Sequence, residues 1–357
     1  MPPLGHDGTQ DDAPYNATLP SCLLCEEPVT ATDLRRHLES PAAFRVALGI
    51  YAVALALGLK RFLVWDQILV LEGAGVWPVF SSLHPHAFRW LVMQPALAFG
   101  NADIPPDAAF TVICFGLVWA TTVLLARAGS LAAGKVVAER VARESSVRVW
   151  LFLPLALATL TMNGRLIPAF AGLALLTALH VDQAAGIRRH LGWLITGQLV
   201  GLLLMSVSSG TFAVGIATVA WSWLTMIGPR WSDPAIRRVL LPLAIALGAG
   251  VGVVGLALAW KAVGFFHGHA MEVLDHGLGG QFARFGVVPA IIGCFATIAA
   301  AILFAWRGRF PAPYGSHLRV PIAASLVLGL IGYATLTTAL PLLLLMGVLA
   351  IVETPSK

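Results

Sequence analysis

The stretch that decides the fold is residues 149–180, VWLFLPLALATLTMNGRLIPAFAGLALLTALH. Two apolar arms, Val149–Met162 and Leu166–His180, flank the polar turn Asn163-Gly164-Arg165. Apolar runs of this length on both sides of a turn predict a pair of antiparallel helices. Each arm is shorter than the ~20 residues that a helix needs to cross a bilayer. Two explanations stay open: the turn lies below the outer surface and lines a cavity, or the bilayer thins locally or the boundaries of the arms are imprecise.

Similar apolar segments recur along the chain, of which 58% is hydrophobic and 11% charged. These proportions predict an all-α polytopic membrane protein with about ten transmembrane helices. The predicted spans are Ala42–Val64, Asp107–Arg127, the two arms above, Leu191–Met205, Phe212–Met226, Val239–Trp260, Val287–Trp306 and two within Val320–Val352. The predicted domains are a tail over residues 1–41, a transmembrane domain over 42–353 and a short tail over 354–357.

Lys and Arg are unevenly divided between the two ends of these predicted spans. Seventeen of the 23 basic residues fall on the side that holds both termini. Short cytoplasmic loops retain Lys and Arg, so both termini are predicted to be cytoplasmic. These loops account for the net charge of +5 without a nucleic-acid partner. The outer basic residues are Lys60, Arg61, Arg89, Arg165, Lys261 and Arg284.

Two long connections have their own patterns. The outer stretch over residues 65–106 is apolar, and its part over 84–100 predicts a helix in the membrane interface or re-entering the membrane. The inner stretch Ala128–Ser146 is polar. Its i,i+4 pair Glu139 and Arg143 predicts a short surface helix within a loop.

Three outer charged residues are candidates for chemistry. Arg165 lies at the tip of a short hairpin, where a guanidinium can bind phosphate or carboxylate. Asp66, which follows Trp65, can act as a general base or neutralise a nearby cation such as Lys60. Arg89 can hold a second phosphate or face lipid headgroups. For Arg165 the alternative is a snorkelling side chain, or one that pairs with Asp66.

Histidines and cysteines supply candidate metal ligands. The outer pairs His84-Pro85-His86 and His267-Gly268-His269, with His276 close after the second, are candidate ligands of a divalent metal such as zinc or manganese. Ordinary polar loop residues are the alternative.

At the amino end, Cys22, Cys25 and His37 resemble most of a zinc finger and form a candidate structural zinc site. A disordered tail with two free thiols is the alternative there. Further cofactors are not indicated by any motif.

With these residues in view, the chain resembles the Wzy-type and EpsG-like polysaccharide polymerases and, more loosely, the GT-C class of membrane glycosyltransferases. The likeness is architectural. It rests on Asp66 at the start of the first outer loop, on the segment HPHAFRWLVMQPALAF over residues 84–99, and on outward-facing arginines on short hairpins. It implies a bacterial inner-membrane enzyme that acts on polyprenyl-linked glycans at the outer face.

The resemblance also implies roles for particular residues. Asp66 would take the proton from an attacking sugar hydroxyl, and Arg89, Arg165 and Arg284 would stabilise the departing diphosphate. His84, His86, His267, His269 and His276 would contribute to substrate binding, on the acceptor side for the last three. Membrane lipid and a polyprenyl-linked glycan are the expected partners.

Three other functional classes stay open. A transporter is compatible with short spans, because broken helices near the midplane form transporter binding sites. A metal-dependent membrane hydrolase would use the outer histidines. A structural or assembly subunit would bind other membrane proteins, with the cysteine-containing tail as its docking element.

Overall fold

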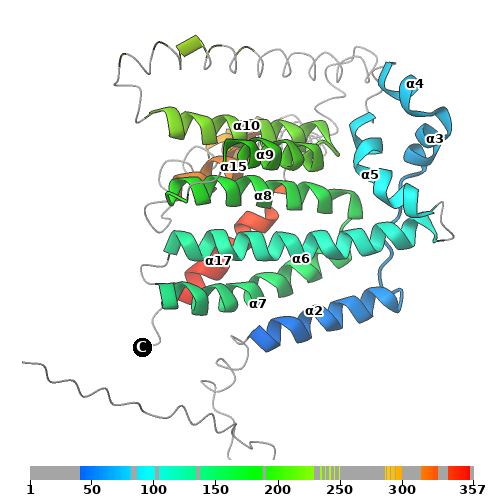
Figure 1. Ribbon diagram of the computed structural model, residues 1–357, viewed down its shortest axis with the longest axis horizontal. Coiled ribbons are helices and arrows are strands. Elements are labelled where there is room, and N and C mark those ends of the chain that lie inside the picture. Colours follow the sequence, from blue (N-terminus) through cyan, green and yellow to red (C-terminus); the bar gives the residue numbers. More distant parts are fainter. Residues whose placement is uncertain are drawn as a thin grey trace, which may run out of the picture.

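A computed structural model describes residues 41–81, 87–100, 104–133, 137–187, 190–228, 315–328 and 337–353, together with isolated positions between 234 and 299. Every regular element within these residues is a helix, which confirms the all-α prediction. The helices pack into a bundle whose members run along one common direction (Figure 1). Its main members are α2 (Pro41–Ala56), α6 (Pro106–Ala133), α7 (Val137–Thr161), α8 (Ile167–Ala184), α9 (Leu191–Met205) and α10 (Ser209–Ile227).

The first helix ends earlier than the hydropathy predicts. The predicted span Ala42–Val64 is helical only to Ala56, where a Schellman turn closes α2. The amides of Gly58 and Leu59 donate to the carbonyls of Leu55 and Ala54, and Gly58 has a φ of 75°. Glycine adopts this left-handed conformation at low cost, so it sets the end of the helix. Residues 60–65 continue without helical structure and are called the linking segment below.

Three short helices cover one end of the bundle (Figure 1). They are α3 (Asp66–Ala74), α4 (Val76–Ser81) and α5 (Ala87–Gly100). The position of α5 agrees with the helix predicted over residues 84–100, and Pro95 lies inside it without ending it. Neither α3 nor α4 was predicted from the sequence. The side chains of Ile68, Trp90 and Met93 join these helices to the core of the bundle.

The prediction that Ala128–Ser146 forms a loop is wrong. Helix α6 continues to Ala133 and α7 begins at Val137, so most of the polar stretch is helical. Hydropathy marks where apolar residues end, whereas a helix continues as long as its residues favour helical backbone. The first arm of the hairpin is therefore part of a helix of 25 residues.

Helix α8 is the central element, with all but three of its 18 residues buried. Small residues allow its close approach to α9. A β-carbon added to Gly172 would lie 2.6 Å from the carbonyl oxygen of Gly201, and one added to Gly201 would lie 2.7 Å from Leu176. Close packing through small residues is typical of helix pairs in membranes.

The remaining predictions agree with the structure where it describes them. Helices α9 and α10 form the second hairpin, joined at residues 206–208. Two helices, α15 (Gly315–Leu328) and α17 (Leu340–Glu353), lie largely within the last apolar block, and α15 begins five residues before it. Helix α15 pairs with α10, and α17 with α7 and α6. The predicted spans Val239–Trp260 and Val287–Trp306 lie mostly outside the described residues.

Within the part of the chain that the structure describes, two helices are long and apolar enough to cross a membrane, by length and composition: Pro106–Leu131 and Gly164–Ala184. Five further apolar helices of 10–17 residues are present among the described residues. The short arms predicted for the second hairpin correspond to two of these five helices. Those predicted for the first hairpin are wrong, because Val149–Met162 belongs to the 25-residue α7 and Leu166–His180 to the helical stretch Gly164–Ala184. The number of spans therefore stays a prediction.

Candidate functional site

The linking segment is anchored to the first turns of α6. The amide of Phe62 donates to the hydroxyl of Thr111 at 3.1 Å, and the amide of Val64 donates to the carboxylate of Asp107. Phe62 and Val64 are buried, whereas Arg61 and Leu63 between them are exposed. This alternation is that of extended chain with one face against the bundle. Trp65 follows at its end and is half-buried.

The turn of the first hairpin packs directly against this segment. The Oδ1 atom of Asn163 accepts a hydrogen bond of 3.1 Å from the amide of Arg165 and caps the short 3-10 helix Gly164–Leu166. A β-carbon added to Gly164 would lie 2.7 Å from the β-carbon of Phe62. Glycine is thus required here for the approach of the two backbones. The contact fixes Arg165 relative to Trp65, three residues beyond Phe62.

The structure brings two of the predicted site residues onto one aromatic ring. The guanidinium carbons of Arg89 and Arg165 lie 4.6 Å and 4.7 Å from the centroid of Trp65. Because both carbons lie close to the same centroid, the distance between them is at most the sum of 4.6 Å and 4.7 Å. Each guanidinium gains cation–π attraction from the indole. We call Trp65, Arg89 and Arg165 the arginine–tryptophan cluster.

Like charges at this separation repel each other. The pKa of Arg89 is lowered to about 10, first because the side chain is buried and second because of the positive charge of Arg165. Both effects penalise the charged form of Arg89. An anion that binds both guanidinium groups would offset that penalty. The planar donors of arginine suit the oxygens of phosphate and carboxylate, so the cluster has the chemistry of a phosphate or diphosphate site.

Asp66 is the first residue of α3 and follows Trp65 directly in the chain. Its side chain is exposed, and it forms no ion pair with any residue that the structure describes. The ion pairs of Asp66 with Lys60 or Arg165, which were the alternatives to a chemical role, are therefore not formed. The carboxylate of Asp66, one residue after Trp65 in the chain, therefore remains available as a proton acceptor.

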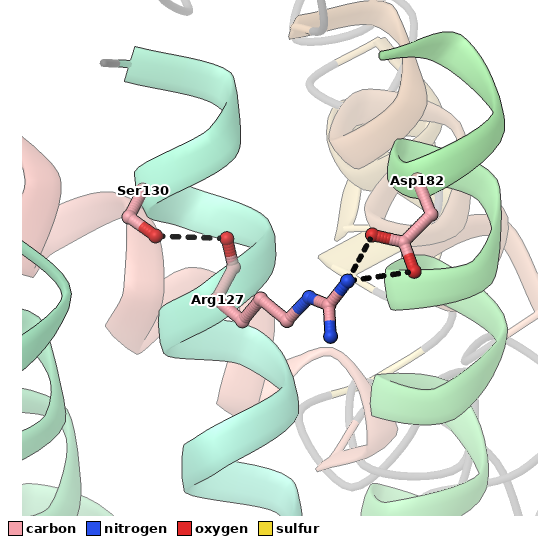
Figure 2. A network of polar contacts seen from close by, with 3 residues as sticks. All are labelled: Arg127, Ser130 and Asp182. Carbon is pink, nitrogen blue, oxygen red and sulfur yellow. Dashed lines mark hydrogen bonds and ion pairs between the residues drawn. The ribbon is translucent and has the colours of Figure 1, made fainter. Parts of the chain in front are cut away.

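A second group of charged and polar residues was missed in the sequence. A nitrogen of Arg127 on α6 lies 3.2 Å from the carboxylate of Asp182 on α8, as Figure 2 shows. The side chain of Asp182 is 4% exposed and that of Arg127 is 42% exposed. Arg127 was counted among the cytoplasmic loop residues, yet it lies within α6. The only feature of the sequence that could have indicated this ion pair is the acidic residue Asp182, soon after the second arm of the first hairpin.

More polar residues line the same region of α8. The Nδ1 atom of His180 lies 2.8 Å from the hydroxyl of Ser222, which donates to the side-chain oxygen of Gln183 at 3.2 Å. His180 and Gln183 also line a cavity of about 270 Å³, together with Thr225. His180 is buried, so the sequence places an ionisable ring inside a helix that is long and apolar enough to span a membrane. Such residues are costly in a membrane and usually serve a function.

The other predicted site residues lie outside the part of the chain that the structure describes. They are His84, His86, His267, His269, His276 and Arg284, and the tail residues Cys22, Cys25 and His37. Among the described residues, no three potential metal ligands of the His, Cys, Asp or Glu type come together. The candidate metal sites therefore stay predictions.

Comparisons with known proteins give no relative. No protein family, curated protein or solved structure matches the chain. The function is therefore inferred from the sequence and the site.

Proposed function

We propose that the protein is a multi-pass membrane glycosyltransferase or polysaccharide polymerase, which transfers sugars from polyprenyl diphosphate at the outer face of a bacterial inner membrane. About ten spans with cytoplasmic termini follow from the apolar segments and the distribution of basic residues. Large exposed apolar side chains support placement in a membrane. On α2 they include Val46, Ile50 and Val53, and on α9 they include Trp193 and Leu199.

The observation that carries the proposal is the pair of guanidinium groups on Trp65. A diphosphate leaving group gains negative charge as its bond to the sugar breaks. Donors fixed in advance around that charge stabilise the transition state without reorganising. The stacking on Trp65 supplies this fixed arrangement. Arg89 and Arg165 are therefore the residues proposed to bind the diphosphate, as the resemblance implies.

In the proposed reaction the hydroxyl oxygen of an acceptor sugar attacks the anomeric carbon of the donor. A carbon–oxygen bond forms to the acceptor, and the bond from the anomeric carbon to the diphosphate oxygen breaks. Asp66 accepts the hydroxyl proton, for which its exposed carboxylate is suited. The negative charge leaves on the polyprenyl diphosphate, next to Arg89 and Arg165. Arg284 and the outer histidines are proposed to bind the substrates.

A transporter is the second candidate, and one observation favours it. Among the described helices, α6 and α8 are long and apolar enough to span a membrane, and they carry the half-exposed Arg127 and the buried His180 and Asp182. Buried ionisable groups at such positions are typical of proton and solute pathways. Flux of solute or protons in proteoliposomes that contain the purified protein would favour this function over glycosyl transfer.

The experiment that tests the proposal compares lipid-linked and released glycans by mass spectrometry. The gene is deleted in the organism that encodes it, and the strain is complemented with the wild type, Arg165→Gln or Lys60→Gln. Lys60 is the matched control because it is a cation of the linking segment that faces Phe62, 5.8 Å from the ring centroid, and does not contact Trp65.

Loss of a long glycan and accumulation of its lipid-linked precursor in the deletion strain is the expected result. Lys60→Gln should restore the glycan and Arg165→Gln should not, at equal protein levels. An unchanged glycan profile in the deletion strain would exclude the proposed function. Restoration by Arg165→Gln would remove the cluster from the mechanism.

A further inference from the structure

A groove lies between the end of α2 and the first turns of α6, next to the linking segment. Its volume is about 320 Å³. Small residues keep it open, because Ala52, Ala56 and Gly58 on one side face Ala108 on the other. Leu55, Val112 and Phe115 make its walls apolar. The volume is near the lower end of the ~300–1,000 Å³ typical of small-molecule pockets, which suits part of a hydrocarbon chain.

One cation lines this groove. Arg61 is exposed and belongs to the lining, whereas its neighbour Lys60 faces Phe62. The hydroxyl of Thr111, the other polar group of the lining, already donates to the carbonyl of Asp107 and accepts from the amide of Phe62. Arg61 is therefore the group of the lining that can bind an anionic headgroup, and its guanidinium suits phosphate oxygens.

The surface around the groove matches lipid. Leu57, next to the lining residues Ala56 and Gly58, is 74% exposed, and Val112 in the lining is 69% exposed. Apolar surface of this kind next to a cation occurs where hydrocarbon meets headgroups at the edge of a bilayer. Arg61 and Trp65 are four residues apart in extended chain, which separates them by about 13 Å. The groove is thus distinct from the arginine–tryptophan cluster.

From this arrangement we infer that the groove binds an anionic phospholipid of the outer leaflet. One acyl chain lies between α2 and α6, and the phosphate lies on Arg61. The bound lipid covers the joint between α2 and the linking segment, whose other end carries Trp65. The inference goes beyond the proposed glycosyl transfer: it requires that these helices contact a bilayer, but not that the protein has any enzymatic activity.

Lipid binding to the purified full-length protein tests the inference. Native mass spectrometry in a neutral detergent measures the affinity for dioleoyl phosphatidylglycerol and, for comparison, dioleoyl phosphatidylcholine. Arg61→Gln removes the cation, and Lys60→Gln is its matched control. Ala56→Phe fills the groove, and Val53→Phe adds the same ring to the same helix outside the lining. Ala56 and Val53 are both exposed, so neither variant disturbs the core.

The wild type should bind phosphatidylglycerol at least about tenfold more tightly than phosphatidylcholine, and Arg61→Gln should remove this preference. Ala56→Phe should weaken binding of both lipids, whereas Lys60→Gln and Val53→Phe should bind as the wild type does. Equal binding of the two lipids by the wild type would overturn the inference. Equal losses in Lys60→Gln and Arg61→Gln would also overturn it. So would displacement of phosphatidylglycerol by a lower concentration of a polyprenyl diphosphate, which would assign the groove to the substrate.

Discussion

Replacement of Gly164 by alanine tests how the cluster is assembled. The new β-carbon would lie 2.7 Å, 2.8 Å and 3.0 Å from the Cβ, Cδ1 and Cγ atoms of Phe62. Phe62 is 1% exposed and its amide is bonded to Thr111, so it has little room to move. Overpacking of this kind costs about 1–3 kcal/mol, and the loss of glycine entropy in the unfolded chain offsets up to about 1 kcal/mol. We expect a net loss of about 1–2 kcal/mol in the free energy of unfolding.

The assay is reversible denaturation of the purified protein in detergent, followed by binding of a polyprenyl diphosphate. Gly116→Ala is the matched control, because a β-carbon at this position of α6 has no other atom within 4 Å. It should stabilise the protein by about 0.5–1 kcal/mol through helix propensity. Gly164→Ala should also weaken binding, because a displaced Phe62 shifts Trp65. Equal stability of the two variants, with unchanged binding, would refute the packing described above.

Three further predictions concern charge and topology. Arg127→Ala removes the ion pair with the buried carboxylate of Asp182 and should cost about 3 kcal/mol, whereas Asp182→Asn should cost less because Arg127 is half-exposed. Thermal unfolding midpoints in the opposite order would contradict this. The pKa of Arg89 is lowered to about 10, so its charge and the affinity for diphosphate should fall as the pH rises through this value. Titrated binding should show that step in the wild type and lack it in Arg89→Gln. The third prediction concerns topology and uses a cysteine-free background with a single cysteine placed at Asn163 or at His190. An impermeant maleimide should label the first cysteine from outside and the second only after permeabilisation. The same response at both sites would exclude an odd number of membrane crossings between them.

Most of the helical architecture is predictable from the sequence. Continuous apolar runs and the polar turns between them locate α8, α9 and α10 within a few residues. Helix ends set by backbone conformation are harder to predict. Gly58 ends α2 inside an apolar run, and α7 begins within a polar stretch. In both cases the hydropathy of the sequence changes at one residue and the backbone conformation changes at another.

The candidate site is predictable only in part. Arg89 and Arg165 stand out in the sequence as rare outer charges, and the structure places both at Trp65. The role of Trp65 depends on the extended backbone of the linking segment. That backbone is fixed by contacts with Gly164 and Thr111, which lie far away in the sequence. Local patterns carry no information on such contacts, so the ring that joins the two arginines could not be foreseen.

The most direct test of the central claim is the affinity of the purified protein for a short-chain polyprenyl diphosphate. Calorimetry would compare the wild type with Arg89→Gln, Arg165→Gln and the control Lys60→Gln, and the free polyprenol would serve as the uncharged ligand. We predict that each arginine substitution weakens binding about 10- to 100-fold, that Lys60→Gln binds as the wild type does, and that the polyprenol does not compete. Equal affinities of the wild type and both arginine variants would contradict the account, because the arginine–tryptophan cluster would then not be the diphosphate site.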